Sequence, residues 1–510
     1  MFSTHHLRMR VLILTLLVAV CVSAALANTE GSKKSSRSFK DMIRRAGKSI
    51  KTAFKKLGNA INQKMMNFKK KLSKYKNKIL EKLHLTKEKR EKLMQRLKFW
   101  KRKNVDKVQP TGDSIEEINL QVRGGDMFQG DMALSREQQD QVEADIAGTR
   151  SKRQAYNDKA YPGKRWYKGV HYFFDGSAST QVQSVFTKAA QQWMADTCID
   201  FIPSRTAEDS IRVYMEDGCW SFVGRLGGTQ NLSLGVGCES IGTAAHELGH
   251  AIGLFHTHSR HDRDLFITVD KNNIKPDWLD QFMLESTRTN NNYNITYDYG
   301  SLMHYGATSS SVDKGRLTMV PNDIQYTETL GSPFIAYYDL LMINRYYNCT
   351  DKCKGKEPKC QNNGFANPRN CKKCVCPSGY GGDLCEKRPT GCGGDLEASN
   401  TWKPLQDETG DRKAGGSPRE DFVKCNYWIK APKGKNIEVK IISFTEGVAV
   451  DGCTYAGVEI KTHWDQRLSG HRFCSKVDAN TVLKSNLSMV PVITYNRIYA
   501  TVTKLEYRYV

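Results

Sequence analysis

The chain has 510 residues, which is too long for one ordinary hydrophobic core and predicts several domains. Its net charge of +23 is concentrated in residues 31–110, where 28 Lys and Arg face 5 Asp and Glu, a surplus equal to that of the whole chain. The remainder is nearly neutral. The near-neutral remainder does not have the composition of a nucleic-acid-binding protein. The basic segment at 31–110 is considered separately below.

The first 27 residues have the features of an export signal. A basic start with Arg8 precedes an apolar run at 11–22, and small residues at Ala25 and Ala27 are typical of a cleavage site. No later stretch approaches the roughly 20 apolar residues of a transmembrane helix. We therefore expect a signal peptide at 1–27, no transmembrane anchor, and a secreted, extracellular protein.

The cysteines fit an oxidising compartment. Of fifteen, Cys21 belongs to the signal, and the other fourteen all lie after residue 197. An even number there predicts seven disulfides rather than metal-thiolate sites. Four acceptor sequons fit the same compartment and predict glycosylation at Asn231, Asn294, Asn348 and Asn486.

A lysine-rich stretch runs from Lys33 to Lys103 and lacks proline and cysteine. Apolar residues such as Ile50, Phe54 and Leu57 recur at three- and four-residue steps, which predicts amphipathic helices with a cationic face. A solvated, partly disordered helical pro-segment is the favoured interpretation. A helix that binds anionic membranes or glycans is the alternative.

A basic cluster follows at Arg150-Ser151-Lys152-Arg153, in a polar stretch that a protease of the secretory pathway could reach. We expect an activating protease to cut after Arg153. Residues 28–153 would then be a propeptide, and Gln154 would be the mature N-terminus. Residues 154–349 combine strand-like and helical segments, which predicts an α+β domain.

Two cysteine-bearing segments complete the chain. Six cysteines fall between Cys353 and Cys385, where a core is impossible at that size without disulfides. From residue 392 onward, segments such as 437–441 and 498–502 have the pattern of strands. About 110 residues of this kind predict an all-β sandwich.

The stretch from His246 to His256 predicts a metal site. On a helix, His246 and His250 share one face and can present two imidazole nitrogens to a single zinc ion, one per chain. Gly253 can end that helix at positive φ and turn His256 back towards the metal. Three neutral nitrogens leave a fourth position for water, which is typical of a catalytic zinc, and Glu247 is placed to take its proton. A helix with incidental histidines is the alternative, and five fixed positions in eleven argue against it.

This motif is similar to the long zinc motif of the metzincin proteases, and its continuation from Thr257 to Asp264 resembles the astacin family in particular. The resemblance implies a two-lobed peptidase fold and zinc metalloendopeptidase activity. The segment from Ser301 to Tyr305 resembles the family's methionine turn. Met303 would form the floor beneath the zinc, and Tyr305 would be a displaceable ligand that stabilises the oxyanion.

Two more implications concern the ends of the peptidase region. Phe128-Gln129-Gly130-Asp131 resembles the family's pro-segment motif, which implies that Asp131 binds zinc in place of water. The family usually has Glu after the third histidine, where this chain has Thr257, so the anchoring of the mature N-terminus is left open. The resemblance also implies the disulfides Cys198–Cys349 and Cys219–Cys238.

The C-terminal modules are similar to an EGF-like module at 350–386 and a CUB domain at 392–508. Six cysteines allow fifteen pairings in the first module. Many CUB domains have an acidic calcium ligand soon after the third cysteine, where this chain has Tyr455 followed by Ala456, so calcium is not expected there. Protein contacts through the CUB domain are expected. The resemblance implies the pairs Cys353–Cys371, Cys360–Cys374, Cys376–Cys385, Cys392–Cys425 and Cys453–Cys474.

Two functions of different classes account for these features. The first is a secreted astacin-type endopeptidase, made as a zymogen, that hydrolyses extracellular proteins; the module order resembles secreted nematode astacins. The second is a non-catalytic binding protein that works through its EGF-like and CUB-like modules, and it predicts a damaged zinc site. Because the three ligands and the base are all present, the first is favoured. A membrane-active peptide released from the N-terminal segment is a compatible addition.

Overall fold

The chain divides into two compact units, Met1–Lys64 and Met65–Val510. The expected signal peptide, the basic cluster at 150–153 and Gln154 lie outside the described residues. No helix within the described part of the chain is long and apolar enough to cross a membrane. The computed structural model describes residues 60–61, 63–101, 105–123, 127–147, 164–287, 290–313 and 315–510.

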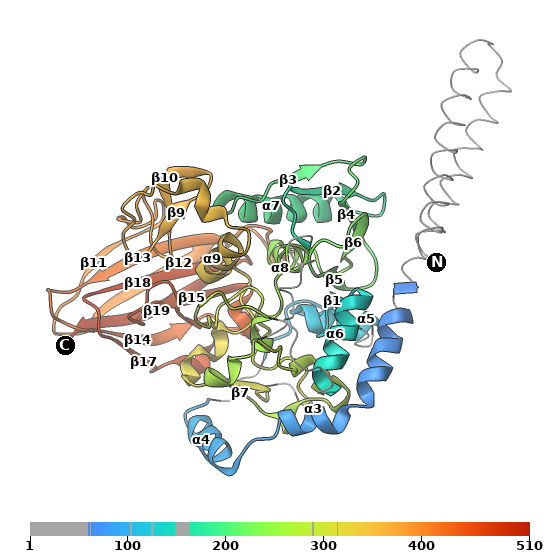
Figure 1. Cartoon of the computed structure of the whole chain (residues 1–510). Helices are drawn as coiled ribbons and strands as arrows, with labels where there is room; N and C mark the ends of the chain where they lie inside the picture. Colours follow the sequence, from blue (N-terminus) through green and yellow to red (C-terminus); the bar gives the residue numbers. More distant parts are fainter. Residues whose placement is uncertain are drawn as a thin grey trace, which may run out of the picture. The chain divides into compact units, whose positions relative to one another are not determined.

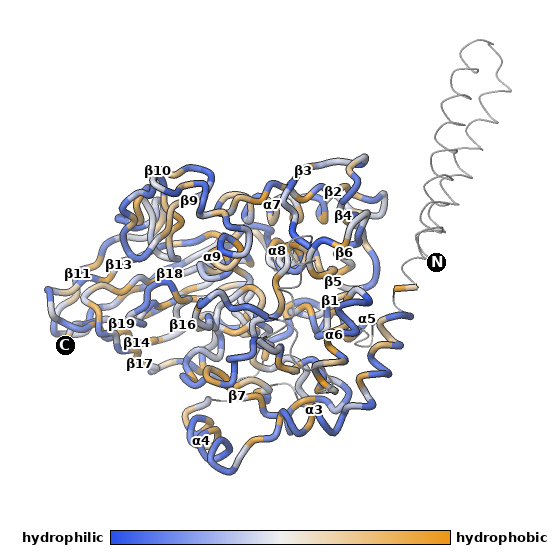
Figure 2. The backbone as a smooth tube through the Cα atoms, in the orientation of Figure 1, coloured by the Kyte–Doolittle hydropathy of each residue, from blue (hydrophilic) through white to orange (hydrophobic). Residues whose placement is uncertain are grey.

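The lysine-rich stretch forms amphipathic helices, as its spacing predicts. Residues 65–73 are helical and are followed by α3 (Lys76–Lys82) and α4 (Lys87–Leu97). Figure 2 shows hydrophobic and hydrophilic residues interleaved along this region. The apolar side chains that are buried include Met65, Phe68, Leu72, Ile79 and Leu83.

Residues 65–97 are ordered rather than partly disordered: most of their polar side chains are exposed to solvent, but their apolar side chains are buried. The guanidinium of Arg96 donates hydrogen bonds to the carbonyls of Val320 and Pro321 in the peptidase region, at 3.3 and 3.0 Å. The ring of Phe68 lies 6.2 Å from that of Phe128. The apolar face is thus buried against the protein's own surface, because three- and four-residue spacing gathers it on one side of the helices.

A six-stranded sheet in the order β1-β5-β6-β4-β2-β3 forms one lobe of the peptidase region (Figure 1). The strands pair in parallel except for the antiparallel β5–β6 pair. Strand β1 lies in the expected pro-segment and extends the sheet at the β5 edge, which the sequence did not indicate. The strands are β1 (Met132–Ala133), β2 (Val170–Phe174), β3 (Phe201–Pro203), β4 (Ser210–Tyr214), β5 (Cys219–Phe222) and β6 (Thr229–Leu234).

Helices α7 and α8 build the core with this sheet. The indole nitrogen of Trp193 on α7 donates to the carbonyl of Ala245 on α8 at 2.9 Å, and both residues are fully buried. The second lobe contains the antiparallel pair of β7 and β8 and a helix, α9. The bounds are α5 (Ile115–Arg123), α6 (Arg136–Ala147), α7 (Thr180–Asp196), α8 (Ile241–Ala251), β7 (Ile267–Val269), β8 (Met319–Pro321) and α9 (Tyr337–Tyr346).

The segment after α9 is a small unit rich in disulfides. It contains one antiparallel pair, β9 (Phe365–Asn367) and β10 (Asn370–Val375). Its assignment as an EGF-like module stays a prediction. The seven disulfides of the structure are the pairs that the resemblance implies: Cys198–Cys349, Cys219–Cys238, Cys353–Cys371, Cys360–Cys374, Cys376–Cys385, Cys392–Cys425 and Cys453–Cys474.

The C-terminal region is the all-β sandwich expected of a CUB domain. A five-stranded sheet, β11-β13-β18-β15-β16, and a four-stranded sheet, β12-β19-β14-β17, enclose one apolar core. Of the pairs, β11–β13 is parallel and the others are antiparallel. The strands are β11 (Gly393–Glu397), β12 (Lys403–Gly410), β13 (Val423–Lys430), β14 (Ile437–Phe444), β15 (Ala456–Ile460), β16 (His471–Phe473), β17 (Val482–Ser485), β18 (Met489–Asn496) and β19 (Ala500–Tyr509).

The CUB domain is joined to the peptidase region by buried polar contacts. Arg472 and Glu459 form an ion pair of 3.0 Å, and both side chains are almost fully buried. Arg472 also donates to the Ser332 hydroxyl of the peptidase region at 2.5 Å. Burial opposes ionisation of Glu459, but Arg472 and Lys461 hold its pKa at about 2. Both members of this pair belong to the CUB domain, so the pair holds the Arg472 guanidinium in place, and the bond from Arg472 to Ser332 joins the two domains.

One predicted glycosylation site is contradicted. Asn231 lies on β6 between two paired strands, and its side chain is only 5% exposed, so a glycan has no space there. Asn294, Asn348 and Asn486 are exposed. The sequon is a local signal, whereas strand pairing and packing decide whether its asparagine reaches solvent.

Replacing Glu459 should destabilise the molecule strongly. The Glu459→Leu variant leaves the Arg472 guanidinium buried without its carboxylate, which costs about 3–5 kcal/mol, and calorimetry should record a lower Tm. Glu408→Leu is the matched control, since Glu408 forms an exposed pair with Arg412; its Tm should stay close to that of the parent. Equal Tm values for the two variants would contradict the structural role of the buried pair.

Candidate metal centre

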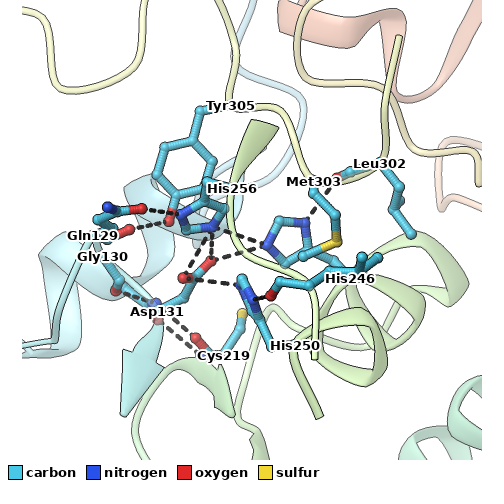
Figure 3. Close-up of polar contacts among 12 residues, drawn as sticks. Gln129, Gly130, Asp131, Cys219, His246, His250, His256, Leu302, Met303 and Tyr305 are labelled. Atoms are coloured by element: carbon cyan, nitrogen blue, oxygen red, sulfur yellow. Dashed lines mark hydrogen bonds and ion pairs between the residues drawn. The ribbon is translucent and has the colours of Figure 1, made fainter. Parts of the chain in front are cut away.

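Helix α8 places the first two histidines. The hydroxyl of Ser240 caps its first turn by accepting from the Thr243 backbone N–H at 3.0 Å. The helix ends at Ala251, and Gly253 follows at φ +114°, a conformation that favours glycine. The chain then turns back, as the sequence predicts, and brings His256 alongside the helix (Figure 3).

The three imidazoles converge through their Nε2 atoms. His246 Nε2 and His256 Nε2 are 3.3 Å apart, and His250 Nε2 lies 3.4 Å from the Asp131 carboxylate that the other two also contact. All three side chains are at most 3% exposed. They are thus enclosed at one point within the peptidase region.

The opposite ring nitrogens are oriented by acceptors. Nδ1 of His246 lies 2.8 Å from the Leu302 carbonyl, and Nδ1 of His250 lies 2.8 Å from the Leu254 carbonyl. Nδ1–H donation to these oxygens leaves each Nε2 with a lone pair for a metal. Burial also lowers the pKa of His250, and that of His256 to about 3, which keeps both rings in the neutral, ligating form.

Asp131 of the pro-segment lies among these nitrogens (Figure 3). Its carboxylate oxygens are 3.1 Å from His246 Nε2 and 3.2 Å from His256 Nε2, and the side chain is fully buried. The sequence predicted this proximity from the pro-segment motif.

The donor set fits a zinc ion. Asp131 and the three histidines each offer a ligand atom, and these atoms all lie within 4.8 Å of one another. Asp131 Oδ1 and His250 Nε2 are buried without a hydrogen-bond partner among the described residues. Both oxygens of the buried Glu247 share that condition, and burial together with Asp131 raises its pKa well above the usual range. A divalent cation would satisfy such an arrangement, with nitrogen and carboxylate ligands typical of zinc.

The segment around Met303 supports the site from below. The Sδ atom of Met303 packs so closely on Gly249 of α8 that a Cβ there would lie 2.6 Å from it. The hydroxyl of Ser301 donates to Asp339 at 2.6 Å, and Asp339 also accepts from the Leu302 N–H at 2.8 Å. Asp339 thereby holds the carbonyl that orients His246. No local pattern marked Asp339 in the sequence, because it comes from α9 and meets this turn only in the fold.

Tyr305 and Gln129 form a second contact between the site and the pro-segment. The Tyr305 hydroxyl donates to the backbone carbonyl of Gln129 at 2.6 Å. The Gln129 side-chain oxygen lies 3.1 Å from His256 Nδ1 and accepts from Ser259. The sequence motif contains Gln129 but did not predict a role for it.

Thr257 stands where the family usually has Glu. Its hydroxyl lies 2.7 Å from the Ser301 hydroxyl, so Thr257 contributes to the support of the turn at residues 301–305.

Comparison with known proteins decides the family. Residues 158–348 match the family described as Astacin, a family of peptidases. Zinc metalloproteinase nas-31 of Caenorhabditis elegans is 45% identical over 414 residues, covering 79% of this chain and 67% of that protein. The chain belongs to the astacin family. It is therefore a zinc metalloendopeptidase, with zinc as its cofactor and with the three histidines forming a site of the required kind.

A second curated relative and a solved structure are also zinc proteases by their names. Zinc metalloproteinase nas-32 of the same organism is 35% identical over 448 residues, covering 87% of this chain and 67% of that protein. Among solved structures, high choriolytic enzyme 1, a hatching enzyme zinc-protease from Oryzias latipes, has 34% identity. That match covers 35% of this chain and 88% of the other, with a TM-score of 0.33.

Removing the Ser301 hydroxyl should weaken zinc binding. In Ser301→Ala the Asp339 carboxylate loses a donor, and the turn that orients His246 loosens; comparable support residues contribute about 10- to 100-fold in metal affinity. Competition with a chromophoric chelator measures the loss. Ser311→Ala, on an exposed turn where the hydroxyl contacts the Asp313 carbonyl, should retain parental affinity. An unchanged zinc affinity in Ser301→Ala would show that the Ser301 hydroxyl does not contribute to zinc binding.

Proposed function

We propose that this endopeptidase is secreted as a zymogen, is activated by cleavage after Arg153, and hydrolyses extracellular proteins. The observation that carries the proposal is the position of Asp131, whose carboxylate contacts the Nε2 atoms of His246, His250 and His256. A carboxylate oxygen is a suitable fourth ligand of zinc, so this residue excludes both substrate and water from the position that catalysis requires.

The pro-segment also blocks the edge of the sheet. Strand β1 pairs in parallel with β5, and the carbonyl of Asp131 accepts from the Ser221 N–H at 3.1 Å. Once β1 has left, the backbone groups of β5 are available to an extended peptide, which can add to an exposed edge strand through main-chain hydrogen bonds. Removal of one segment would therefore open the metal position and the peptide-binding edge together.

The residues of the centre have separate tasks in the proposed reaction. His246, His250 and His256 would hold the zinc ion, which would supply Lewis-acid chemistry and activate a water molecule near neutral pH. Glu247 accepts the proton of the attacking water and passes it to the leaving amine as the peptide bond breaks. The Tyr305 hydroxyl donates to the developing oxyanion. In the structure the Tyr305 hydroxyl donates to the backbone carbonyl of Gln129, and the oxyanion of a bound substrate would likewise form from a backbone carbonyl.

Secretion and the class of substrate rest on composition and compartment. Seven disulfides are expected of a protein that folds in an oxidising environment. The proposed substrates are consequently extracellular proteins, which the enzyme meets after its pro-segment has been removed.

Replacing the base should separate zinc binding from turnover. Glu247→Gln in the mature enzyme keeps all three ligands, so we expect one zinc per chain by elemental analysis. Loss of the proton acceptor should lower kcat by about 10²–10⁴-fold. Glu239→Gln is the matched control, since its carboxylate accepts from the Gly237 N–H just before α8 and lies outside the site. Parental kcat in Glu247→Gln would overturn the assignment of the base.

The latency of the precursor should depend on Asp131. In a precursor made uncleavable at residues 150–153, Asp131→Ala vacates the fourth ligand position, and we expect partial peptidase activity because β1 still covers the β5 edge. Asp140→Ala changes an exposed aspartate of α6 and should leave the precursor inactive. Deletion of residues 28–110 should also preserve latency. If that deletion activates the enzyme while Asp131→Ala does not, the basic segment would be the inhibitor instead.

A further inference from the structure

The pro-segment contacts the CUB domain as well as the metal centre. The Asp106 carboxylate accepts from the Ala449 N–H at 2.8 Å, and the Asp106 N–H donates to the Ala449 carbonyl at 3.0 Å. The Asp113 carboxylate accepts from the Tyr455 hydroxyl at 2.7 Å. Between these two points Val108 packs against the apolar core of the CUB domain. Residues 105–113 thus lie along one face of the CUB domain.

A positive charge lies behind this face. The Arg497 guanidinium is 4.9 Å from the centroid of the Tyr455 ring and donates to the Thr454 carbonyl at 3.0 Å. The carboxylate of Asp113 is among the groups that favour its charged form, although burial of Arg497 opposes it and lowers its pKa. A hydroxyl donor, a backbone N–H and a guanidinium are the groups that bind carboxylates in proteins.

The same face borders a cavity that extends to two residues of the metal centre. One cavity of 90 Å³ is lined by His246 and Tyr305 of the metal centre and by Asp451, Thr454 and Arg497 of the CUB domain. Residues 113–116 of the pro-segment also line it. When the pro-segment has left, a peptide bound at the metal can continue through the vacated space to the CUB domain.

The preference for carboxylates is confined to the CUB end of this path. Glu116 lies nearer the peptidase region, where its carboxylate accepts from the Ser309 hydroxyl. Burial raises its pKa to about 7, and Glu117 and Asp451 add to the rise. Asp451 itself accepts from the Thr308 N–H and hydroxyl at 2.7 and 2.8 Å. The CUB face therefore offers the Ala449 N–H and the Tyr455 hydroxyl as donors to carboxylates, whereas burial beside Ser309 favours the neutral form of Glu116.

We propose that Ala449, Tyr455 and Arg497 form an acidic-peptide site, which the pro-segment fills in the precursor and an acidic segment of the protein substrate fills in the mature enzyme. The inference rests on the proposed removal of the pro-segment and adds a substrate class to it. The enzyme would select extracellular proteins with carboxylates some distance from the scissile bond, in addition to any preference at the metal centre.

Binding can be tested apart from catalysis. The mature Glu247→Gln protein is titrated with a fluorescent peptide of residues 105–117 and with the same peptide carrying Asn at positions 106 and 113. We expect the Asn peptide to bind about tenfold or more weakly, the scale of a hydrogen bond to a charged group. Tyr455→Phe should raise the Kd of the acidic peptide by a similar factor. Tyr427→Phe removes another CUB hydroxyl that donates to an aspartate, Asp407, and should leave Kd unchanged.

Substrate selection is tested in the active mature enzyme. Two protein substrates share one cleavage sequence and differ in a distant segment, acidic in one and amide-substituted in the other. We expect a KM about tenfold lower for the acidic substrate at equal kcat, and loss of that difference in Tyr455→Phe. Equal KM values, or a difference that survives in Tyr455→Phe, would overturn the proposal. Peptide binding without substrate selection would restrict the surface to the pro-segment and also overturn it. No turnover of either substrate would instead count against the proposed peptidase mechanism, while the binding titration still decides the site.

Discussion

Three imidazole rings can hold one metal ion only if their Nε2 lone pairs point to the same place, and here the backbone enforces that geometry. The carbonyls of Leu302 and Leu254 orient two of the rings from behind, and the turn at Gly253 brings the third ring beside them. The Leu302 N–H is in turn bound by Asp339.

The pro-segment uses contacts of the kind that a substrate would need. Its carboxylate meets the ligand nitrogens, its strand pairs with the β5 edge, and a backbone carbonyl accepts from Tyr305. The turn that makes this possible includes Gly130 at φ +93°, where a Cβ would lie 2.7 Å from the Tyr305 hydroxyl. A side chain at this position would force the two apart, so close approach requires glycine.

The CUB domain is joined to the peptidase region by buried polar contacts between the two domains. Its buried Arg472 bonds to Ser332, and the N–H and hydroxyl of Ser469 contact the buried carboxylate of Asp298. Because buried polar groups tolerate little displacement without losing their partners, the two domains share one geometry. The proposed acidic-peptide site would therefore keep a defined position relative to the metal centre.

The sequence alone determined the parts of this protein that depend on local spacing. Helical periodicity placed His246 and His250 on one face, Gly253 marked the turn before His256, and alternating strands indicated the C-terminal sandwich. Only the tertiary structure decided what depends on distant segments meeting: the pairing of β1 with β5, the support of His246 by Asp339, and the burial of Asn231. The sequence predicted the apolar face of the lysine-rich helices, but it did not predict which part of the protein that face packs against. The physical reason is the same in each case, since spacing fixes which side chains share a face, whereas packing across the fold decides what that face touches.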